Sequence, residues 1–577
     1  MSQKVLFVVY DNGAYDHSIP MGFGAIGAIL NRDGHEFTLW NQDMHHWEDD
    51  YLRTYLDENE FDVVIISLIA GYYQYHKMKN LSKAINNSKN RSKFKYIMGG
   101  YGPTPEPEFF IRKSGCDIVC MGEGEVTISK LMESFDNKTP LTDVPGIAWL
   151  ENDKLKQTPR APLIANLDDL PWTPYHKFPI DYYRMSRTAK SRSTDFVMSM
   201  MSARGCSFKC TFCYRMDAGY RKRSPESLLD EVEMLFKDFG INYINFQDDL
   251  LMSSVEHTEL VCKEFLKRNL PIRWQCNGRL NYCSEELLQL MKDAGCDFIN
   301  YGIESMDQKV LNNMKKGLRP EMIIQGVEDT LKVGISPGLN FIFGNKGDNK
   351  KTMKSAVDFM LKYDDFAQKR TIRPVTPYPG SPLYYDAIKM GLLDKDNPAE
   401  DFYERKHLNS DLICTNFTEL SDHEFYECLR WANKTLMKNY YDSHRRGVMD
   451  QIDYLYDYKD VTFRGFRHRT SQGRTGEIFT KKAKVVPIND SKLNTTKPND
   501  EEKYDPTTLP NWENTSSDAE RFSEQNISQH MGSGDKTLDS YESYLKKKAI
   551  RKSEKALAKQ KVLDQKKVNP NPQNIII

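Results

Sequence analysis

The stretch RGCSFKCTFCYR (residues 204–215) is the most informative one in this chain. It places Cys206, Cys210 and Cys213 in the spacing C-x3-C-x2-C, and Phe212 directly precedes the last cysteine. Four cysteine thiolates complete the ligand set of a 4Fe–4S cluster, one for each iron. Three thiolates leave one iron open to a substrate or cofactor, so the stretch predicts an iron–sulfur centre that takes part in chemistry.

Two other uses of clustered cysteines fit the sequence less well. Zinc sites commonly pair a C-x2-C unit with a second pair or with histidines downstream, and no matching pair follows here. Disulfides are typical of secreted proteins, but the chain has an odd number of cysteines, 11, and its first residues do not resemble a secretory leader. We therefore expect free thiols, a cytoplasmic protein, and small buried side chains at most of the other cysteines.

Length and composition limit the class of protein. A chain of 577 residues is longer than one ordinary domain. Its net charge is −1, so no overall field attracts nucleic acid, and we expect no nucleic-acid partner. No apolar run approaches the roughly 20 residues that a membrane-spanning helix needs, so we expect no membrane span.

The hydrophobic pattern and the composition divide the chain into five parts. Short apolar strands alternate with amphipathic stretches in the first and third parts, a Pro- and Tyr-rich linker separates them, and the fourth part has a helical pattern. The last part is rich in Asn, Ser, Lys, Asp and Pro, which is typical of disorder, and its basic end is best explained as a solvated helix or tail. The parts are residues 1–150, 151–191, 192–390, 391–465 and 466–577.

Polar side chains follow several successive strands of the third part. The amphipathic segments between the strands, such as SPESLLDEVEMLFKDFG (224–240), start with Ser and end at Gly, which suit helix caps. The carboxyl ends of parallel strands meet at one edge, where functional groups gather. One such residue alone can simply meet water, but a series of them behind the cysteines favours an active site at a barrel mouth. The residues at these ends are Asp248, Asp249, Arg279, Glu304 and Ser305.

The first part is expected to be a doubly wound, Rossmann-like α/β domain. Its strands include KVLFVVY (4–10), FDVVIISLI (61–69) and a run from 94 that breaks at Gly99 and Gly100. Such a domain binds its ligand across the carboxyl ends of the strands, and glycines let a ligand approach the backbone closely. No G-x-G-x-x-G lies between the first strand and the first helix, so an ordinary dinucleotide site is not expected.

The cysteine stretch resembles the cluster motif of the radical S-adenosylmethionine (radical SAM) enzymes. The resemblance continues through GIESMDQKVLNNMKKG (302–317) and TPYPGSPLYYDAIKMGLL (376–393). It implies a partial (β/α)6 barrel, a 4Fe–4S cluster on the three cysteines, and S-adenosylmethionine (SAM) bound to the open iron. The cofactor contacts that it implies are Phe212, Asp248, Asp249, Arg279, Glu304 and Ser305.

Two segments depart from the commoner pattern of that family. In FQDDLLM (246–252) a Gln-Asp-Asp sequence replaces a glycine-rich motif with glutamate, as in the cobalamin-dependent branch. Either Asp248 or Asp249 can therefore be the contact to the SAM amino group. In GNKGDNKKT (344–352) the family proline is missing, and Asp348 stands where a glutamate is usual.

The first part resembles the cobalamin-binding domain of cobalamin-dependent radical SAM proteins. The two resemblances together cover roughly residues 4–395. The D-x-H-x-x-G motif that supplies a lower cobalt ligand in some cobalamin proteins is absent, because Asp16 and His17 are adjacent. The resemblance implies cobalamin held without a protein histidine, or else a degenerate domain that binds nothing. The matching residues are Pro20, Gly22, Gly99, Gly100, Tyr101, Thr104, Gly122 and Glu123.

The combined resemblance implies an enzyme that methylates an unactivated carbon. In that family a radical derived from SAM removes hydrogen from the substrate, and methylcobalamin delivers the methyl group. Two alternatives stay open: a cyclase or oxidative enzyme similar to the anaerobic magnesium-protoporphyrin ester cyclase, and a non-catalytic cobalamin or cluster sensor. The family also implies an electron donor such as flavodoxin or ferredoxin, and a small-molecule or peptide substrate that the sequence does not identify.

Overall fold

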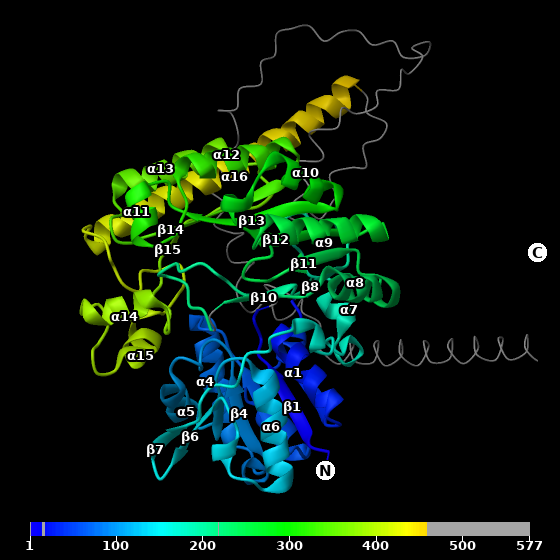
Figure 1. Cartoon of the computed structure of the whole chain (residues 1–577). Helices are drawn as coiled ribbons and strands as arrows, with labels where there is room; N and C mark the ends of the chain where they lie inside the picture. Colours follow the sequence, from blue (N-terminus) through cyan, green and yellow to red (C-terminus); the bar gives the residue numbers. More distant parts are fainter. Residues whose placement is uncertain (1, 14–17, 217–218, 459–577) are drawn as a thin grey trace, which may run out of the picture. The chain divides into compact units, whose positions relative to one another are not determined.

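The computed structural model describes residues 2–13, 18–216 and 219–458 (Figure 1). Asp16 and His17 lie outside the described residues, as does the whole expected tail of residues 466–577. Within the described part, two large sheets form, one from the N-terminal strands and one from a strand just before the cysteine stretch together with the strands that follow it. A short hairpin is inserted in the chain between the first two strands of the second sheet.

The N-terminal sheet has seven strands in the order β2-β1-β3-β4-β5-β6-β7. Strands β1 to β5 are parallel, and β6 and β7 add an antiparallel hairpin at the edge. The order 2-1-3-4-5 is that of a doubly wound fold, which confirms the predicted fold class of the first part. The strands are β1 (Lys4–Val9), β2 (Glu36–Asn41), β3 (Val63–Ser67), β4 (Lys95–Gly99), β5 (Ile118–Cys120), β6 (Ile147–Glu151) and β7 (Lys154–Gln157).

Helices cover both faces of this sheet, so its central strands are apolar throughout. Phe7 of β1 stacks on Phe23 at a ring-centroid distance of 4.5 Å, whereas Leu6 and Val8 belong to the core on the other face. Burial on both faces is why the sequence shows a continuous apolar run instead of alternation. One face packs against α1 (Met21–Arg32) and α6 (Gly124–Asn137), and the other against α3 (Tyr51–Glu58), α4 (Tyr72–Asn86) and α5 (Pro107–Ser114).

The second sheet has six strands, all parallel, in the order β15-β14-β13-β12-β11-β8. It is the curled half-barrel that the partial (β/α)6 prediction describes. Its strands are β8 (Val197–Met200), β11 (Tyr243–Phe246), β12 (Arg273–Gly278), β13 (Cys296–Glu304), β14 (Ser336–Phe343) and β15 (Arg373–Pro374). The helices between them are α8 (Pro225–Phe239), α9 (Val255–Arg268), α10 (Glu285–Asp293), α11 (Gln308–Asn313), α12 (Pro320–Lys332) and α13 (Lys350–Lys362).

The predicted helix caps of this region are present. Ser224 accepts a hydrogen bond from Ser227 N at the start of α8, and Gly240 ends the helix with φ at +69°. Ser284 caps α10 in the same way. These caps satisfy backbone groups that a helix end leaves unpaired, so the local sequence sets where each helix begins and ends.

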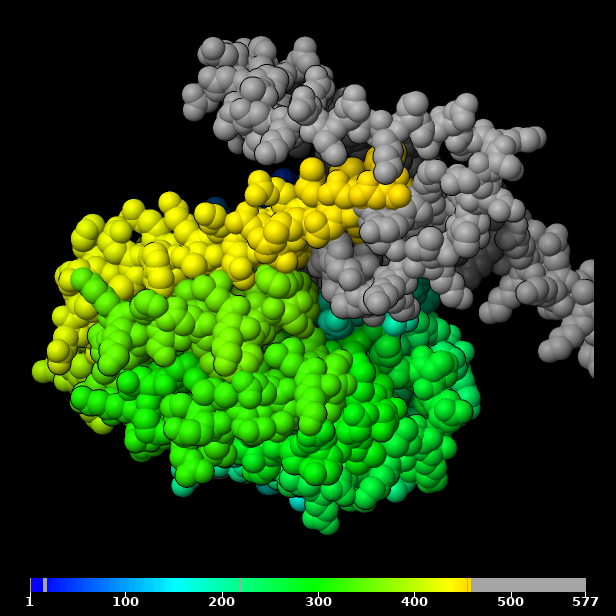
Figure 2. All heavy atoms as spheres, turned by 90° about the horizontal axis from the view of Figure 1, so that it is seen from above, coloured from blue at the N-terminus to red at the C-terminus, as the bar shows by residue number. Residues whose placement is uncertain are grey.

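The chain continues as α14 (Pro382–Lys389), α15 (Pro398–Glu400), a π-helix (Asp401–Lys406) and the long α16 (Asp422–Tyr458). Figure 2 shows α16, in yellow, lying on the green surface of the preceding domain, where it packs against α13. Among the described residues, no helix combines the length and the apolar character needed to cross a membrane.

Candidate active site at the cysteine loop

A short hairpin carries the cysteine loop beyond the carboxyl end of β8. Strands β9 (Ala203–Gly205) and β10 (Tyr220–Lys222) pair antiparallel, and the three cysteines lie between them in the chain. Within the loop, the Thr211 backbone N–H donates to Met314 O at 3.0 Å, and Thr211 O accepts from Leu383 N at 2.9 Å. These bonds hold the loop against the segments that follow β13 and β15.

The three thiols differ in exposure and share a positive environment. Cys210 is buried, Cys206 is half-buried and Cys213 is exposed. Arg279 Nη1 lies 4.0 Å from Cys210 Sγ. A hydrogen bond from Cys213 lowers the pKa of Cys210 to about 6, and the cations Lys316 and Arg279 add to this effect. This shift favours the thiolate form of Cys210, which is the form that binds metal.

Two aromatic rings of the loop lie beneath these cations. Arg279 Cζ is 3.4 Å from the ring centroid of Phe208, and Lys316 Nζ is 5.6 Å from that of Phe212. Arg279 also donates to Lys316 O and, at 3.1 Å, to Asn281 Oδ1. Cation–π contacts and hydrogen bonds together fix both side chains next to the cysteines.

Glu304 ends β13 in a backbone conformation that residues other than glycine rarely adopt. Its φ is +71°, and the pairing of β13 with β14 shifts register between Gly302 and Glu304. The buried carboxylate accepts from Lys316 Nζ at 2.9 Å. Ser305 is also buried, and its hydroxyl accepts from Asp307 N at 3.1 Å. Backbone strain of this kind is concentrated at functional sites.

The two aspartates after β11 have different surroundings. Asp248 is buried and accepts hydrogen bonds from both the backbone N–H, at 2.6 Å, and the hydroxyl of Ser202. Burial raises the pKa of Asp248 to about 7. Asp249 is exposed. Burial raises the pKa of Cys206, and the nearby charge of Asp249 adds to that rise, so Asp249 lies beside the cysteine loop.

The glycine-rich turns of the N-terminal domain meet at the carboxyl ends of β4 and β5. Gly100 has φ at +103°, and a Cβ there would lie 2.4 Å from Leu68 O, so backbone packing itself requires glycine. Thr104 is buried, donates to Gly100 O at 2.7 Å and accepts from Gly122 N at 3.3 Å. Thr104 thereby ties the two turns together.

Tyr101 links this edge to the cysteine loop. Its ring meets that of Tyr214, the residue after the last cysteine, edge to face at a centroid distance of 5.8 Å. Pro20 directly precedes α1, and Gly22 lies in its first turn, where a Cβ would be 3.9 Å from Ser67 Oγ at the end of β3. The residues predicted for the two cofactors therefore come from neighbouring edges of the two domains.

Ion pairs join the start of α6 to the hairpin that carries the cysteine loop. Glu123 is 2.6 Å from Arg221 Nη2 and 3.2 Å from Arg204 Nη1, and Arg204 Nη2 is 2.5 Å from Glu125 Oε1. Although burial opposes it, the two arginines lower the pKa of Glu123. The sequence predicts a cofactor contact for Glu123 only: Glu125 belongs to the same Gly-Glu-Gly-Glu turn (122–125) without a predicted contact, and Arg204 and Arg221 are not predicted. The available signals were the second glutamate of the Gly-Glu-Gly-Glu turn and the arginine two residues before Cys206.

Comparison with known families agrees with this arrangement. A family model for the B12 binding domain matches residues 9–132, and the model for the radical SAM superfamily matches residues 200–360. The chain therefore carries a B12-binding domain followed by a radical SAM domain, the combination that the sequence predicts. Both predicted resemblances are confirmed, and the match to a methyltransferase favours the predicted enzyme over the alternative of a non-catalytic sensor.

Individual proteins of known name are similar over most of the described chain. An uncharacterized methyltransferase of Pyrococcus horikoshii is 29% identical over 367 residues, which are 61% of this chain and 77% of the relative. Cytidylyl-2-hydroxyethylphosphonate methyltransferase of Streptomyces wedmorensis is 25% identical over 458 residues, 70% of this chain and 84% of the relative. The fold is similar to that of the radical SAM methyltransferase TsrM from Kitasatospora setae, whose structure was solved with tryptophan substrate and a SAM analog. The TM-score is 0.60 and the sequence identity is 18%. The match covers 75% of this chain and 89% of the other.

The radical SAM domain implies a 4Fe–4S cluster and SAM as cofactors, and the B12-binding domain implies cobalamin. Among the described residues, no three His, Cys, Asp or Glu side chains converge on a point where they could hold a single metal ion. A 4Fe–4S cluster does not need such convergence, because each thiolate binds a different iron. Three cysteines in one loop, with cations against Cys210, fit a cluster of this kind.

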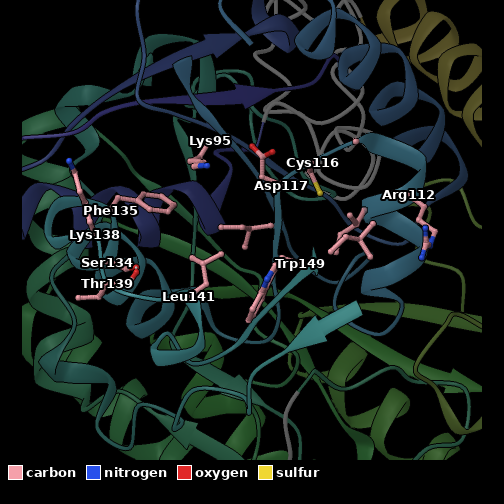
Figure 3. Close-up of a pocket in the computed structure, with 14 residues that line it drawn as sticks. Lys95, Arg112, Cys116, Asp117, Ser134, Phe135, Lys138, Thr139, Leu141 and Trp149 are labelled. Atoms are coloured by element: carbon pink, nitrogen blue, oxygen red, sulfur yellow. The ribbon is translucent and has the colours of Figure 1, made fainter. Parts of the chain in front are cut away.

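A cavity of about 900 Å³ lies at the opposite edge of the B12-binding domain (Figure 3). Lys95, which begins β4, and Asp117, which precedes β5, line it together with Trp149 and Phe135. Doubly wound domains bind their ligands at the carboxyl ends of the strands, whereas these residues mark the amino ends. The cavity therefore lies at the wrong end of the strands for the cofactor, and the glycine-rich turns at the carboxyl ends remain the expected cofactor site.

Proposed function

We propose that this radical SAM enzyme transfers a methyl group from SAM to an unactivated carbon of its substrate. The observation that carries the proposal is the set of ion pairs that connects its two domains beside the cysteine loop. Arg204, two residues before Cys206, pairs with Glu123 and Glu125 at the carboxyl edge of the B12-binding domain. This supports a reaction in which cluster and cobalamin serve one substrate, as does the methyltransferase name of the relatives.

When bound, the cluster and cobalamin would supply hydrogen abstraction through SAM and delivery of the methyl group. One turnover uses two SAM molecules and two electrons. The substrate C–H bond is replaced by a C–CH3 bond, and the abstracted hydrogen leaves in 5′-deoxyadenosine. Methionine and S-adenosylhomocysteine are the other products. A low-potential one-electron protein donor such as flavodoxin or ferredoxin would supply the electrons one at a time.

The residues of this chain take the following roles in the proposal. Cys206, Cys210 and Cys213 hold the cluster, and Arg279 with Lys316 offsets the charge of the thiolates. Asp249, exposed beside the loop, accepts hydrogen bonds from the SAM ammonium group. The other proposed contacts to SAM are Phe212, Glu304 and Ser305. The proposed contacts to cobalamin are the glycine-rich turns together with Pro20, Tyr101 and Thr104.

The state of the thiols supports a reducing compartment. All 11 cysteines lie in the described part of the chain and are free of disulfide bonds. Free thiols of this number are typical of the cytoplasm. We propose that the enzyme works there, where flavodoxin- or ferredoxin-type donors can also reach it.

Anaerobic reconstitution with iron and sulfide tests the cluster assignment. The Cys206→Ala, Cys210→Ala, Cys213→Ala triple variant should lose the cluster, whereas the Cys428→Ala variant, altered on α16, should bind iron like the wild type. Retention of wild-type iron by the triple variant would overturn the assignment. SAM carrying a labelled methyl group then separates the reactions: label in the product supports methyl transfer, and 5′-deoxyadenosine without label transfer contradicts it in favour of cyclisation or oxidation.

A further inference from the structure

Amide side chains line the face of the second sheet opposite its helices. Along each strand, alternate residues pack against the helices: Phe246 contacts Phe265 of α9, and Tyr301 shares a hydrogen bond with Thr330 of α12. The residues between them point to the other face. Six of these residues form what we call the inner wall: Ser199, Asn245, Gln275, Asn277, Asn300 and Asn340.

Hydrogen bonds link the inner wall across the strands. Asn245 Oδ1 accepts from Gln275 Nε2 at 2.9 Å. Two residues further along the strands, Asn300 donates to Asn277 Oδ1 at 3.0 Å and accepts from Asn340 Nδ2 at 2.7 Å. An amide side chain has two N–H donors and an oxygen that accepts twice. Each central amide is therefore held in a fixed orientation and still has donors and acceptors for another molecule.

The N-terminal domain reaches the same surface. Gln247, just after β11, donates to Ser199 Oγ of the inner wall at 3.3 Å and to Ser18 Oγ at 3.4 Å. Ser18 lies in the segment that leads into Pro20 and α1. The inner wall is thus continuous with the side of the B12-binding domain to which we assign the cobalamin.

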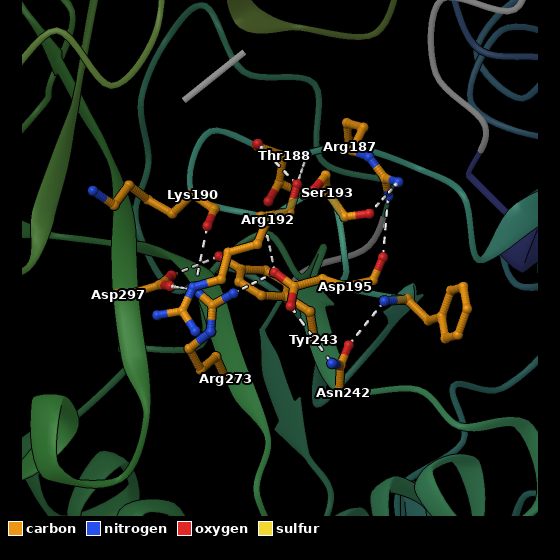
Figure 4. Close-up of polar contacts among 12 residues, drawn as sticks. Arg187, Thr188, Lys190, Arg192, Ser193, Asp195, Asn242, Tyr243, Arg273 and Asp297 are labelled. Atoms are coloured by element: carbon orange, nitrogen blue, oxygen red, sulfur yellow. Dashed lines mark hydrogen bonds and ion pairs between the residues drawn. The ribbon is translucent and has the colours of Figure 1, made fainter. Parts of the chain in front are cut away.

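The inner wall lies between two charged layers and carries no charge itself. Strands β8 and β11 to β14 contain only three charged residues, Arg273, Asp297 and Glu304. Figure 4 shows the first two in a network at the amino ends of the strands, where Arg273 pairs with Asp195 and Asp297, and Tyr243 donates to Asp297 at 2.6 Å. Glu304 stands at the other end, beside the cysteine loop.

The inner wall is open to a ligand. Asn340 is exposed, and the other four amides are half-buried. An apolar molecule laid on them would displace water without replacing its hydrogen bonds, which is unfavourable. A phosphate or carboxylate placed there would meet no cation of the wall to offset its loss of hydration. The surface therefore selects against both apolar and anionic groups.

We infer that the inner wall binds an uncharged part of the substrate that is dense in hydroxyl, amide or ring N–H and carbonyl groups. The inference rests on the proposed function, since it takes the half-barrel as the place where the substrate reacts. An unactivated C–H bond makes no hydrogen bonds to the protein. Hydrogen bonds to neighbouring heteroatoms of the substrate must therefore orient it toward the SAM-derived radical. The inner wall supplies such bonds in a fixed pattern.

The test uses the reconstituted holoenzyme and small molecules extracted from the organism that makes it, partitioned between water and octanol. The rate of 5′-deoxyadenosine formation reports substrate binding, and labelled methyl transfer from SAM reports the reaction. We expect the aqueous fraction to raise 5′-deoxyadenosine formation several-fold. The Gln275→Leu and Asn340→Leu variants should each lose most of that stimulation, whereas Gln289→Leu, changed at an exposed position of α10, should keep it. SAM affinity, iron content and the thermal midpoint should be those of the wild type in all three.

The outcomes separate this inference from the proposed function. Stimulation by the octanol fraction, no stimulation by the aqueous fraction, or stimulation that survives in Gln275→Leu and Asn340→Leu would overturn the inference. Stimulation that depends on Gln275 and Asn340 but brings no labelled product would support the inference and contradict methyl transfer. A variant with reduced SAM affinity would show that its amide serves SAM, which also counts against the inference.

Discussion

Arg221 donates to both carboxylate oxygens of Glu123, at 2.6 and 2.9 Å. Glu123 precedes α6 in the B12-binding domain, and Arg221 lies on β10, the strand that closes the cysteine loop. Both side chains are mostly shielded from water, with exposed fractions of 12% and 15%. A bidentate ion pair of this kind fixes the relative orientation of the two side chains as well as their distance, so it orients the hairpin against the neighbouring domain.

Glu123→Gln should destabilise the protein without emptying the cluster site. The variant keeps one acceptor for Arg221 but loses the charge, and a hydrogen bond to a charged group contributes about 1.5–3 kcal/mol. We expect the free energy of unfolding to fall by that amount in urea, while the iron content after reconstitution stays at the wild-type level because all three cysteines remain.

Glu151→Gln is the matched control for this variant. Glu151 is exposed and its pair with Lys156 is long, at 3.8 Å, so its loss should cost less than about 0.5 kcal/mol. Equal urea midpoints for the two variants would show that the pair between Glu123 and Arg221 stabilises the protein no more than an exposed ion pair does.

Asp248 and Asp249 should respond differently to the same substitution. In Asp248→Asn, the amide oxygen can still accept from Ser202 N and the amide group can donate to the Ser202 hydroxyl, so we expect folding and SAM affinity to change little. In Asp249→Asn, the exposed negative charge beside the cysteine loop is lost. A charged hydrogen bond of about 1.5–3 kcal/mol corresponds to a roughly tenfold to hundredfold weaker SAM affinity.

Equilibrium binding of SAM to the reconstituted protein measures this difference. Iron content serves as the internal control, because neither aspartate is a proposed ligand of the cluster. If Asp248→Asn weakened SAM binding as much as Asp249→Asn, the assignment of the ammonium contact to Asp249 would be wrong.

Local pattern predicts most of the fold here but little of what distinguishes neighbouring residues. The cysteine spacing, the apolar strands and the polar strand ends are features of short segments, and both parallel sheets follow from them. The pair between Glu123 and Arg221 spans 98 residues and forms only when two domains meet. Likewise, the buried carboxylate of Asp248 accepts hydrogen bonds from Ser202, 46 residues earlier, and no local signal marks that partner.

Gly99→Ala and Gly100→Ala should distinguish two reasons for a glycine at the end of β4. Backbone packing requires glycine at Gly100, whereas close approach of a ligand is the reason proposed at Gly99. At Gly100, with φ at +103°, a Cβ would lie 2.4 Å from Leu68 O and 3.0 Å from Leu68 N, atoms that cannot move aside alone. We expect Gly100→Ala to cost about 1–3 kcal/mol or more. A Cβ at Gly99 would meet only Cys120, at an ordinary 3.7 Å, so the fold should tolerate it.

Cobalamin titration provides the second measurement for this pair. If the ligand approaches the backbone at the end of β4, the extra methyl group of Gly99→Ala should weaken binding of hydroxocobalamin to a protein of unchanged urea midpoint. Wild-type affinity in that variant would place the cobalamin away from Gly99.

Asp348 should make the stability of the barrel depend on pH. Asp348 is buried, with its carboxylate accepting from the backbone N–H of Gly344 and Asn345 at 3.0 and 2.9 Å and from Thr352 Oγ1 at 2.8 Å. Burial raises the pKa of Asp348 from 3.8 to about 6. The neutral acid therefore favours the folded state: its contribution is complete below about pH 4 and is lost as pH rises through about 6.

Asp348→Asn removes this titration and keeps an oxygen acceptor for the two backbone N–H groups. A shift of about two pKa units corresponds to about 3 kcal/mol. We therefore expect the variant to gain up to about 3 kcal/mol of unfolding free energy over the wild type between pH 4 and pH 8, measured in urea with the metal-free proteins. Asp358→Asn, altered at an exposed position of α13, should show no such trend. A difference between Asp348→Asn and wild type that stayed constant across this range would mean that Asp348 is already ionised in the folded protein at pH 4, at no cost to its stability.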